Sequence, residues 1–147
     1  MTLDSDSWAE RARKALADSG HRSGQARGAV LELLDAQPCA RSVLEIEDAL
    51  RAGGRPVARA SIYRILDELE RLRLVAKVQV GQDMAHFEPI RAGAGHHHHL
   101  VCDSCGTVTP FTDEGVEDAI RALSSRVPMR VAEHEIVLHG ACEDCAS

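Results

Sequence analysis

Two Cys-x-x-Cys pairs constrain this chain more than any other feature. Cys102 and Cys105 follow four histidines in the stretch HHHHLVCDSCG (96–106), and Cys142 and Cys145 lie in ACEDCAS. Four thiolates on two tight turns are the ligand set of a closed tetrahedral zinc site. We therefore expect one structural zinc ion, with Gly106 relieving the backbone after the first pair. Two disulfides or a redox-active Cys-x-x-Cys are the alternatives for these residues.

The histidine run needs its own explanation. An affinity tag lies at a terminus, whereas these histidines continue directly into a strand-like segment and a cysteine pair. Along an extended strand, His96 and His98 point to one side and His97 and His99 to the other. The run is therefore expected to supply two ligands to each of two further metal sites.

Composition indicates a soluble globular protein of one ordinary domain or two small ones. The 147 residues are 44% hydrophobic and 27% charged, and no apolar run is long enough for a membrane span. The N-terminal stretch has no apolar core of a secretory signal, so the five cysteines favour a cytoplasmic location, where thiols bind metals. Cys39, the fifth cysteine, is expected to be a small buried residue, with metal ligation as the alternative.

Charge is distributed unevenly along the chain. The net charge of −6 argues against a general nucleic-acid binder. Residues 1–80, however, hold 13 Lys and Arg against 12 Asp and Glu, whereas residues 81–147 hold 4 against 11. An acidic half rich in His and Cys suits cations, and an Arg-rich half suits phosphates.

Helical periodicity dominates the first part of the chain. Helices are expected at 7–19, at 23–36 and from Ser42, where Ser42-Val-Leu-Glu45 forms a capping box. The most regular helix is expected at about 59–73. Its apolar stripe comprises Ile62, Ile65, Leu66, Leu69 and Leu72. The runs LVAKVQV and MAHFEP then flank a hairpin signal at 81–83, so the order predicts a winged helix-turn-helix. A generic helical bundle with a hairpin is the alternative.

The small-residue segment PIRAGAG (89–95) marks the expected domain boundary, with domains at 1–89 and 90–147. In the second domain, HLVC and TVTPF read as strands, 113–126 as a helix and 129–139 as a strand. The helix is expected to turn four residues inward: Val116, Ala119, Ile120 and Leu123. A unit of about 55 residues is hard to stabilise alone, so zinc and a dimer partner are the expected supplements.

Over nearly its full length the chain resembles the ferric uptake regulator family. The resemblance is carried by GHRSGQARGAVLELL (20–34), ARASIYRILDELERLRLV (58–75), FE (87–88), HHHHLVCDSCG (96–106) and HEIVLHGACEDC (134–145). It implies an α+β protein with an N-terminal winged helix-turn-helix and a small C-terminal α/β dimerisation domain. It also implies a dimeric repressor of metal-uptake and homeostasis genes that binds operator DNA when its regulatory metal is bound.

The resemblance assigns three metal sites. The structural zinc site matches Cys102, Cys105, Cys142 and Cys145. A second site in the dimerisation domain matches His96, His98, Glu117 and His134. A regulatory site at the domain hinge matches Glu88, His97 and His99.

The hinge site departs from the family pattern. Positions that supply a further ligand in iron-type or zinc-type relatives hold residues without one here, namely Ala40, Ala76 and Ile90. Cys39 and His86 are the candidates for the fourth ligand. The histidine at 98 favours zinc sensing, whereas the retained Glu88 favours iron, and we expect zinc with iron(II) next.

On DNA, the resemblance assigns the minor-groove contact to Arg22 and the recognition-helix pair to Tyr63 and Arg64. The full expected set of DNA-binding residues is Arg22, Arg27, Arg59, Ser61, Tyr63 and Arg64. For Tyr63, a half-buried structural tyrosine is the alternative.

Other classes of protein fit the sequence less well. A zinc hydrolase needs an open metal position and a general base, and no H-E-x-x-H occurs. A thiol oxidoreductase needs a lone activated Cys-x-x-Cys, so we expect no enzyme. A metal storage or shuttle protein without DNA binding, and a peroxide-sensing member of the same family, are the alternatives. The expected partners are double-stranded operator DNA and a second copy of the chain.

Overall fold

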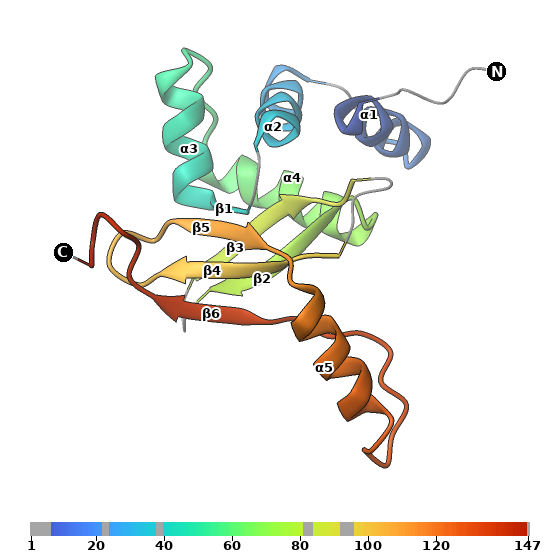
Figure 1. Cartoon of the computed structure of the whole chain (residues 1–147). Helices are drawn as coiled ribbons and strands as arrows, with labels where there is room; N and C mark the ends of the chain where they lie inside the picture. Colours follow the sequence, from blue (N-terminus) through green and yellow to red (C-terminus); the bar gives the residue numbers. More distant parts are fainter. Residues whose placement is uncertain (1–6, 22–23, 38–39, 81–83, 92–95, 147) are drawn as a thin grey trace. The chain divides into compact units, whose positions relative to one another are not determined.

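The chain divides into two compact units, Met1–Ala94 and Gly95–Ser147 (Figure 1). The computed structural model describes residues 7–21, 24–37, 40–80, 84–91 and 96–146. The sequence placed the boundary at 89/90. Ile90 N–H donates to Leu74 O at 2.8 Å, and the Arg91 guanidinium donates to Asp35 O at 2.6 Å. These two hydrogen bonds attach the start of the linker segment to the first unit.

Four helices form most of the first unit: α1 (Trp8–Asp18), α2 (Gln25–Ala36), α3 (Val43–Ala52) and α4 (Arg59–Arg71). The predicted capping box is confirmed at α3, where Ser42 Oγ accepts from Glu45 N–H and Glu45 Oε1 accepts from Ser42 N–H. Beyond α3, Gly54 adopts φ +76°, which a residue with a Cβ rarely tolerates. No helix among the described residues is long and apolar enough to cross a membrane.

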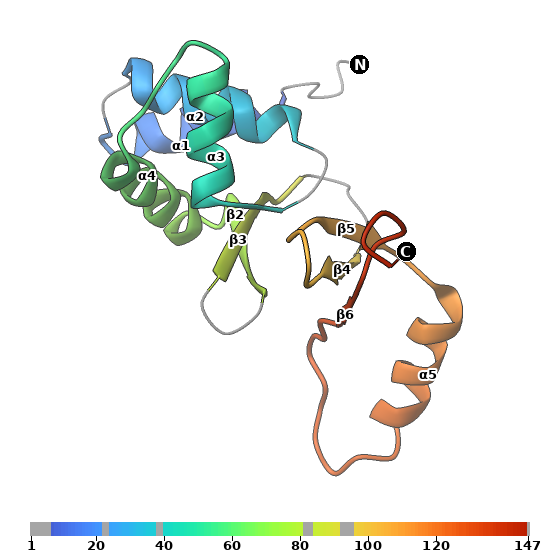
Figure 2. The ribbon, with the colours of Figure 1, turned by 90° about the vertical axis from the view of Figure 1, so that its left-hand side faces the viewer.

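A three-stranded antiparallel sheet completes the first unit. Its strands are β1 (Arg41–Ser42), β2 (Val75–Val80) and β3 (Met84–Pro89), in the order β1-β3-β2. The predicted hairpin is β2–β3. The two-residue β1 was not predicted, because so short a strand shows no period of its own. Figures 1 and 2 show the helices over one face of this sheet.

The core of the first unit lies between the helices and the sheet. The predicted stripe of α4 is at its centre, with Ile62, Ile65, Leu66 and Leu69 buried. Trp8, the single tryptophan, is 2% exposed, and its Nε1–H donates to Leu74 O at 2.9 Å. Each buried aliphatic side chain contributes about 1.5–3 kcal/mol, so this stripe fixes which face of α4 points outward.

The second unit is a mixed sheet with one helix. Its strands are β4 (His98–Cys102), β5 (Val108–Phe111) and β6 (Val137–Gly140), in the order β5-β4-β6, with β6 parallel to β4. The expected strand at 129–139 is wrong for residues 129–136, which form no strand. β6 pairs with β4 from Val137↔His99 to Gly140↔Cys102. The short β4 therefore limits the length of its partner.

The helix of the second unit, α5 (Glu114–Ser124), extends away from the sheet (Figures 1 and 2). Asp113 caps it, because its Oδ1 accepts from Val116 N–H at 2.9 Å. The expectation that its apolar stripe turns inward is wrong for the single chain. None of the residues of α5, all of which the structure describes, is buried, and Leu123 is 48% exposed. Within the part of the chain that the structure describes, nothing therefore buries the stripe fully.

Candidate metal centres

The four cysteines of the two pairs converge at one end of the second sheet. Their Sγ atoms all lie within 4.8 Å of one another, and all four are free thiols. Parallel pairing of β4 with β6 sets Cys102 opposite Gly140, two residues before Cys142, so the two turns start side by side. The four cysteines therefore form no disulfide with one another. Tetrahedral zinc–thiolate bonds of about 2.3 Å require sulfurs about 3.8 Å apart, and Cys105 Sγ lies 3.8 Å from Cys142 Sγ.

Each turn is closed by backbone hydrogen bonds that leave the thiols pointing at the centre. Gly106 N–H donates to Cys102 O at 2.8 Å, and Gly106 adopts the positive φ, +78°, that the sequence predicts for it. In the second turn, Ala146 N–H donates to Cys142 O at 2.8 Å. Backbone hydrogen bonds of the chain itself therefore form both cysteine turns.

Protonation in the cysteine cluster is uneven. Backbone N–H groups, first that of Cys142, lower the pKa of Cys102 to about 6. Hydrogen bonds with the other thiols, first Cys142, raise the pKa of Cys145 to about 12. The thiolate of Cys102 is therefore favoured near neutral pH, whereas a full set of four thiolates needs a cation among them. This donor set fits zinc.

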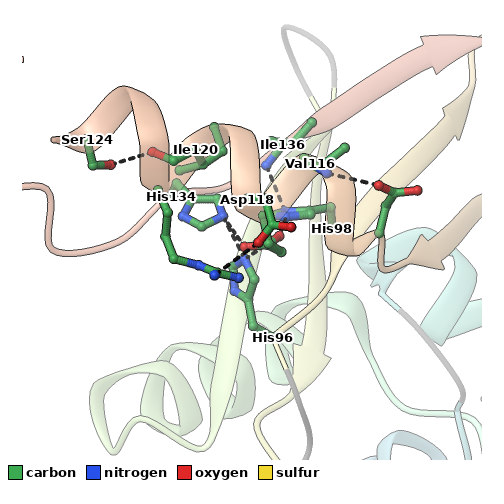
Figure 3. A network of polar contacts seen from close by, with 11 residues as sticks. His96, His98, Val116, Asp118, Ile120, Ser124, His134 and Ile136 are labelled. Atoms are coloured by element: carbon green, nitrogen blue, oxygen red, sulfur yellow. Dashed lines mark hydrogen bonds and ion pairs between the residues drawn. The ribbon is translucent and has the colours of Figure 1, made fainter. Parts of the chain in front are cut away.

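A second cluster gathers three histidines and one carboxylate (Figure 3). His98 lies on β4, His96 just before it, Glu117 on α5 and His134 in the segment before β6. Glu117 Oε1 lies 2.5 Å from His98 Nε2, Glu117 Oε2 lies 2.8 Å from His134 Nε2, and His96 Nε2 lies 3.1 Å from His134 Nε2. One ligand atom from each of the four residues lies within 4.8 Å of the others, as a single metal ion requires.

The hydrogen bonds of His98 determine where its proton lies. Ile136 N–H donates to His98 Nδ1 at 3.2 Å, so the neutral ring carries its proton on Nε2, toward Glu117. That hydrogen bond from His98 lowers the pKa of Glu117. A metal at this position would replace the proton between the two groups, and its binding would therefore release a proton.

The alternation predicted for the histidine run is confirmed. The rings of His96 and His98 lie 4.4 Å apart between centroids, and those of His97 and His99 lie 5.0 Å apart. The first pair belongs to the cluster with Glu117. The second pair forms a separate group, and His99 Nδ1 lies 3.9 Å from Glu135 Oε1.

The remaining hinge candidates lie in the first unit. Glu88 is in β3, directly opposite Ala76 of β2, which offers no ligand atom. His86, two residues earlier, is fully buried, and its Nε2 lies 3.2 Å from Glu45 Oε1. Cys39 lies outside the described residues. Because Glu88 belongs to one unit and His97 and His99 to the other, the hinge site remains a proposal.

The expected DNA-binding residues fall into two groups. Tyr63 is 49% exposed and Arg64 is exposed, and the guanidinium of Arg64 donates to Ser61 Oγ at 3.1 Å. Arg27 and Arg59 instead contact carboxylates, Arg27 at 2.6 Å from Glu68 and Arg59 at 2.9 Å from Glu47. Arg22 lies outside the described residues.

The sequence did not reveal several of these contacts. Glu47, Glu68 and Glu135 gave no motif, because side-chain pairs between different elements have no fixed spacing. Thr107 Oγ1, 3.1 Å from Cys105 Sγ, was also missed, although a hydroxyl two residues after a cysteine was visible in the sequence. The hydrogen bond from Ile136 to His98 depends on the register of β6 and had no sequence signal.

Comparison with known proteins gives a consistent result. The model of the ferric uptake regulator family matches residues 18–139. The ferric uptake regulation protein of Bacillus subtilis (strain 168) is 27% identical over 138 residues, covering 92% of this chain and 93% of that protein. That of Legionella pneumophila is 30% identical over 131 residues, covering 88% and 95%.

Solved structures agree with the sequence comparison. The fold matches the Helicobacter pylori ferric uptake regulator Fur with a TM-score of 0.81 at 24% identity, covering 100% of this chain and 95% of that one. The Vibrio cholerae ferric uptake regulator matches with a TM-score of 0.77 at 28% identity, covering 88% and 98%.

Proposed function

The chain belongs to the ferric uptake regulator family, and from that premise we propose that it represses metal-uptake genes by binding operator DNA as a metal-loaded dimer. Members of the family are metal-responsive transcription regulators, not enzymes. One observation carries the proposal. The single strand β4 begins with histidines directed to two different sides and ends in the cysteine cluster. A metal that moves the histidines would therefore also move β4, the strand that carries Cys102 of the cysteine cluster.

The structural metal is proposed to be zinc, held by Cys102, Cys105, Cys142 and Cys145. Four thiolates leave no open coordination position, so this metal supports the fold and does no chemistry on a substrate. The small second unit, whose one helix buries no residue, needs such support.

The second site, His96, His98, Glu117 and His134, is proposed to hold zinc as well. Three imidazoles and one carboxylate suit several transition metals, and four donors converging on one point suit the tetrahedral preference of zinc. Iron(II) is the next candidate, because it accepts the same donors but seeks more of them.

The regulatory site is proposed at the hinge, with Glu88, His97 and His99 as ligands and His86 or Cys39 as the fourth. The rings of His97 and His99 form a pair separate from the second site, and two neighbouring imidazoles suit a further metal. A metal that joins ligands from both units fixes the angle between them. Two recognition helices of a dimer must lie about 34 Å apart on DNA, so that angle decides whether both can dock.

DNA contact is proposed through Tyr63, Arg64 and Ser61 on the exposed face of α4, with Arg22 in the minor groove. The aromatic ring and guanidinium are exposed next to each other on one helix, as base reading in a major groove requires. Such a regulator acts where genomic DNA is, so the cytoplasm is its proposed location.

The dimer partner is proposed to cover the exposed apolar residues of the second unit. Leu123 is 48% exposed, Leu138 51% and Met129 71%. An amphipathic helix whose apolar stripe is not buried in its own chain is typical of an interface between copies.

A DNA-binding titration for each metal tests the proposal. The operator is first selected from a random duplex library with zinc-loaded protein. Binding to this duplex is then measured with zinc, iron(II) or manganese, each added to protein whose structural zinc is retained. We expect the affinity for the operator to rise about 100-fold when the cognate metal is added and to stay unchanged when another metal is added. A metal-binding protein that never prefers one duplex would instead be a storage or shuttle protein.

A further inference from the structure

The first residue of the proposed recognition helix α4, Arg59, forms an ion pair with a buried carboxylate. Glu47 of α3 is 8% exposed, and its Oε2 lies 2.9 Å from Nε of Arg59 while its Oε1 lies 3.2 Å from the Arg59 Nη2. Arg51 of α3 adds a third contact at 3.3 Å. A carboxylate this buried is stable only if it is paired and hydrogen-bonded. Arg59 supplies two of its three contacts, although the Arg59 side chain is itself 55% exposed.

The start of α4 depends on this pair. Its N-cap residue is Ala58, whose side chain cannot accept a hydrogen bond, and its first residue is basic. A positive charge at a helix N-terminus opposes the helix dipole. The Glu47 carboxylate neutralises that charge. The pKa of Glu47 is lowered, chiefly by its hydrogen bond from Arg59.

The opposite end of α4 has a corresponding contact. Glu68, in the last turn, lies 2.6 Å from the Arg27 guanidinium of α2 and 3.4 Å from Nδ1 of His21. The Arg27 and Glu68 side chains are 18% and 22% exposed. Ion pairs from two different helices therefore hold the two ends of α4.

We propose that Glu47 and Glu68 are positioning residues that fix α4 for base reading, with Arg59 and Arg27 serving these carboxylates rather than DNA phosphates. The inference rests on the proposed function of the chain as an operator-binding regulator. Apolar contacts between helices are non-directional. The paired guanidinium and carboxylate groups define where α4 stands along its axis, and thus where Tyr63 and Arg64 lie.

The pairs also limit attraction to DNA of any sequence. Each phosphate contact by Arg adds sequence-independent affinity and steepens the dependence of binding on salt. Two arginines whose charges are matched by carboxylates add little of this affinity. The two ion pairs therefore raise the ratio of operator binding to random-DNA binding in two ways: they position α4, and they reduce the affinity for phosphates.

The test uses Glu47→Gln in the full, zinc-loaded chain, with Asp48→Asn as its control. Asp48 is the next residue of α3, its side chain is 75% exposed, and the control makes the same change in charge. Affinity for the selected operator and for a scrambled duplex is measured at several salt concentrations. For Glu47→Gln we expect tighter binding to the scrambled duplex, a salt slope steeper by about one, and a preference for the operator reduced about tenfold. The control should keep the parent's preference.

Two further variants make the outcome decisive. Glu68→Gln, at the less buried end, should lose preference in the same way and answers the question if Glu47→Gln does not fold. Arg59→Gln should lose preference while keeping the parent's salt slope, whereas a phosphate-contacting Arg59 would flatten the slope by about one. Unchanged operator preference in Glu47→Gln and Glu68→Gln would overturn the positioning role of the two carboxylates and leave the regulator function intact. A parent chain without operator preference overturns both.

Discussion

Arg59 and Arg64 lie on the same helix but in different chemical surroundings. Both side chains are exposed, but Arg59 donates two hydrogen bonds to the buried carboxylate of Glu47, whereas Arg64 donates to the hydroxyl of Ser61. The same residue type therefore serves the fold at one position and is available to DNA at the other. Residue identity alone cannot separate these roles, but the partner of each guanidinium does.

Stability of the first unit should depend on pH through Glu47. Its pKa is lowered in the folded chain by Arg59, so the ionised carboxylate stabilises the fold above its unfolded pKa and this contribution is lost as the pH falls through the folded pKa. We expect the stability advantage of the parent over Glu47→Gln to shrink as the pH falls from about 5 to about 3. Urea unfolding followed by fluorescence of the buried Trp8 measures it. A difference independent of pH would contradict the assignment.

Loss of one zinc ligand should disable the second unit. Cys102→Ser removes the most buried thiol of the cluster, and structural zinc supplies about 10–16 kcal/mol in small zinc domains. We expect zinc content near zero by elemental analysis and a monomeric protein in sedimentation. Ser104→Ala, in the same turn, is the control and should keep both zinc and dimer. A zinc-free but dimeric Cys102→Ser protein would show that the cluster is dispensable.

At the scale of elements, α5 presents a stripe that its own chain leaves exposed. Leu123→Glu places a charge on that stripe, and we expect the dimer to dissociate at micromolar concentration while the zinc content stays unchanged. Ala122→Glu introduces the same side chain at an exposed position beside the stripe and should remain dimeric. Sedimentation velocity distinguishes the two. Dimers in both variants would place the interface elsewhere on the second unit.

Elements with strong local signals were predictable from the sequence. The α4 stripe repeats at helical spacing and the Ser42 capping box is local, so both could be predicted without tertiary information. β6 was predicted too long, because its length depends on the short β4 rather than on its own alternation. The α5 stripe was predicted to be buried because periodicity shows that a face is apolar, but not which chain covers it.

The candidate sites were predictable to different degrees. The cysteine pairs and the alternating histidines follow from spacing, and the structure brings each set together. The Glu47–Arg59 pair could not be predicted from the sequence, because it depends on how α3 packs against α4. Charged residues with no helical or strand period are generally placed by packing rather than by local sequence.

For the molecule as a whole, the proposed hinge metal would couple its two compact units. A metal shifts the equilibrium only by its differential affinity for the two arrangements, and a 100-fold bias corresponds to about 2.7 kcal/mol. We expect His97→Ala to remain a folded, zinc-containing dimer whose operator affinity no longer rises with added metal. His139→Ala, which removes an exposed histidine paired with Asp103, should respond like the parent.

The outcome for the companion ligand decides where the switch lies. Glu88→Gln should lose the metal response in the same DNA-binding titration, because it removes the carboxylate that the first unit is proposed to supply to the hinge metal. If His97→Ala and Glu88→Gln both respond like the parent, the regulatory metal is held by His96, His98, Glu117 and His134 instead.

The parallel pairing of β4 with β6 also has a consequence for how quickly the two proposed kinds of metal would leave. The two cysteine pairs follow these two paired strands, so the proposed zinc ion would leave only when both turns release it, and we expect its exchange to be slow. The histidine cluster is joined through side chains of α5 and of the segment before β6, which can move without breaking the sheet. We therefore expect the chain to retain the zinc ion that it acquires during folding, while the metal at the histidines exchanges with the current supply.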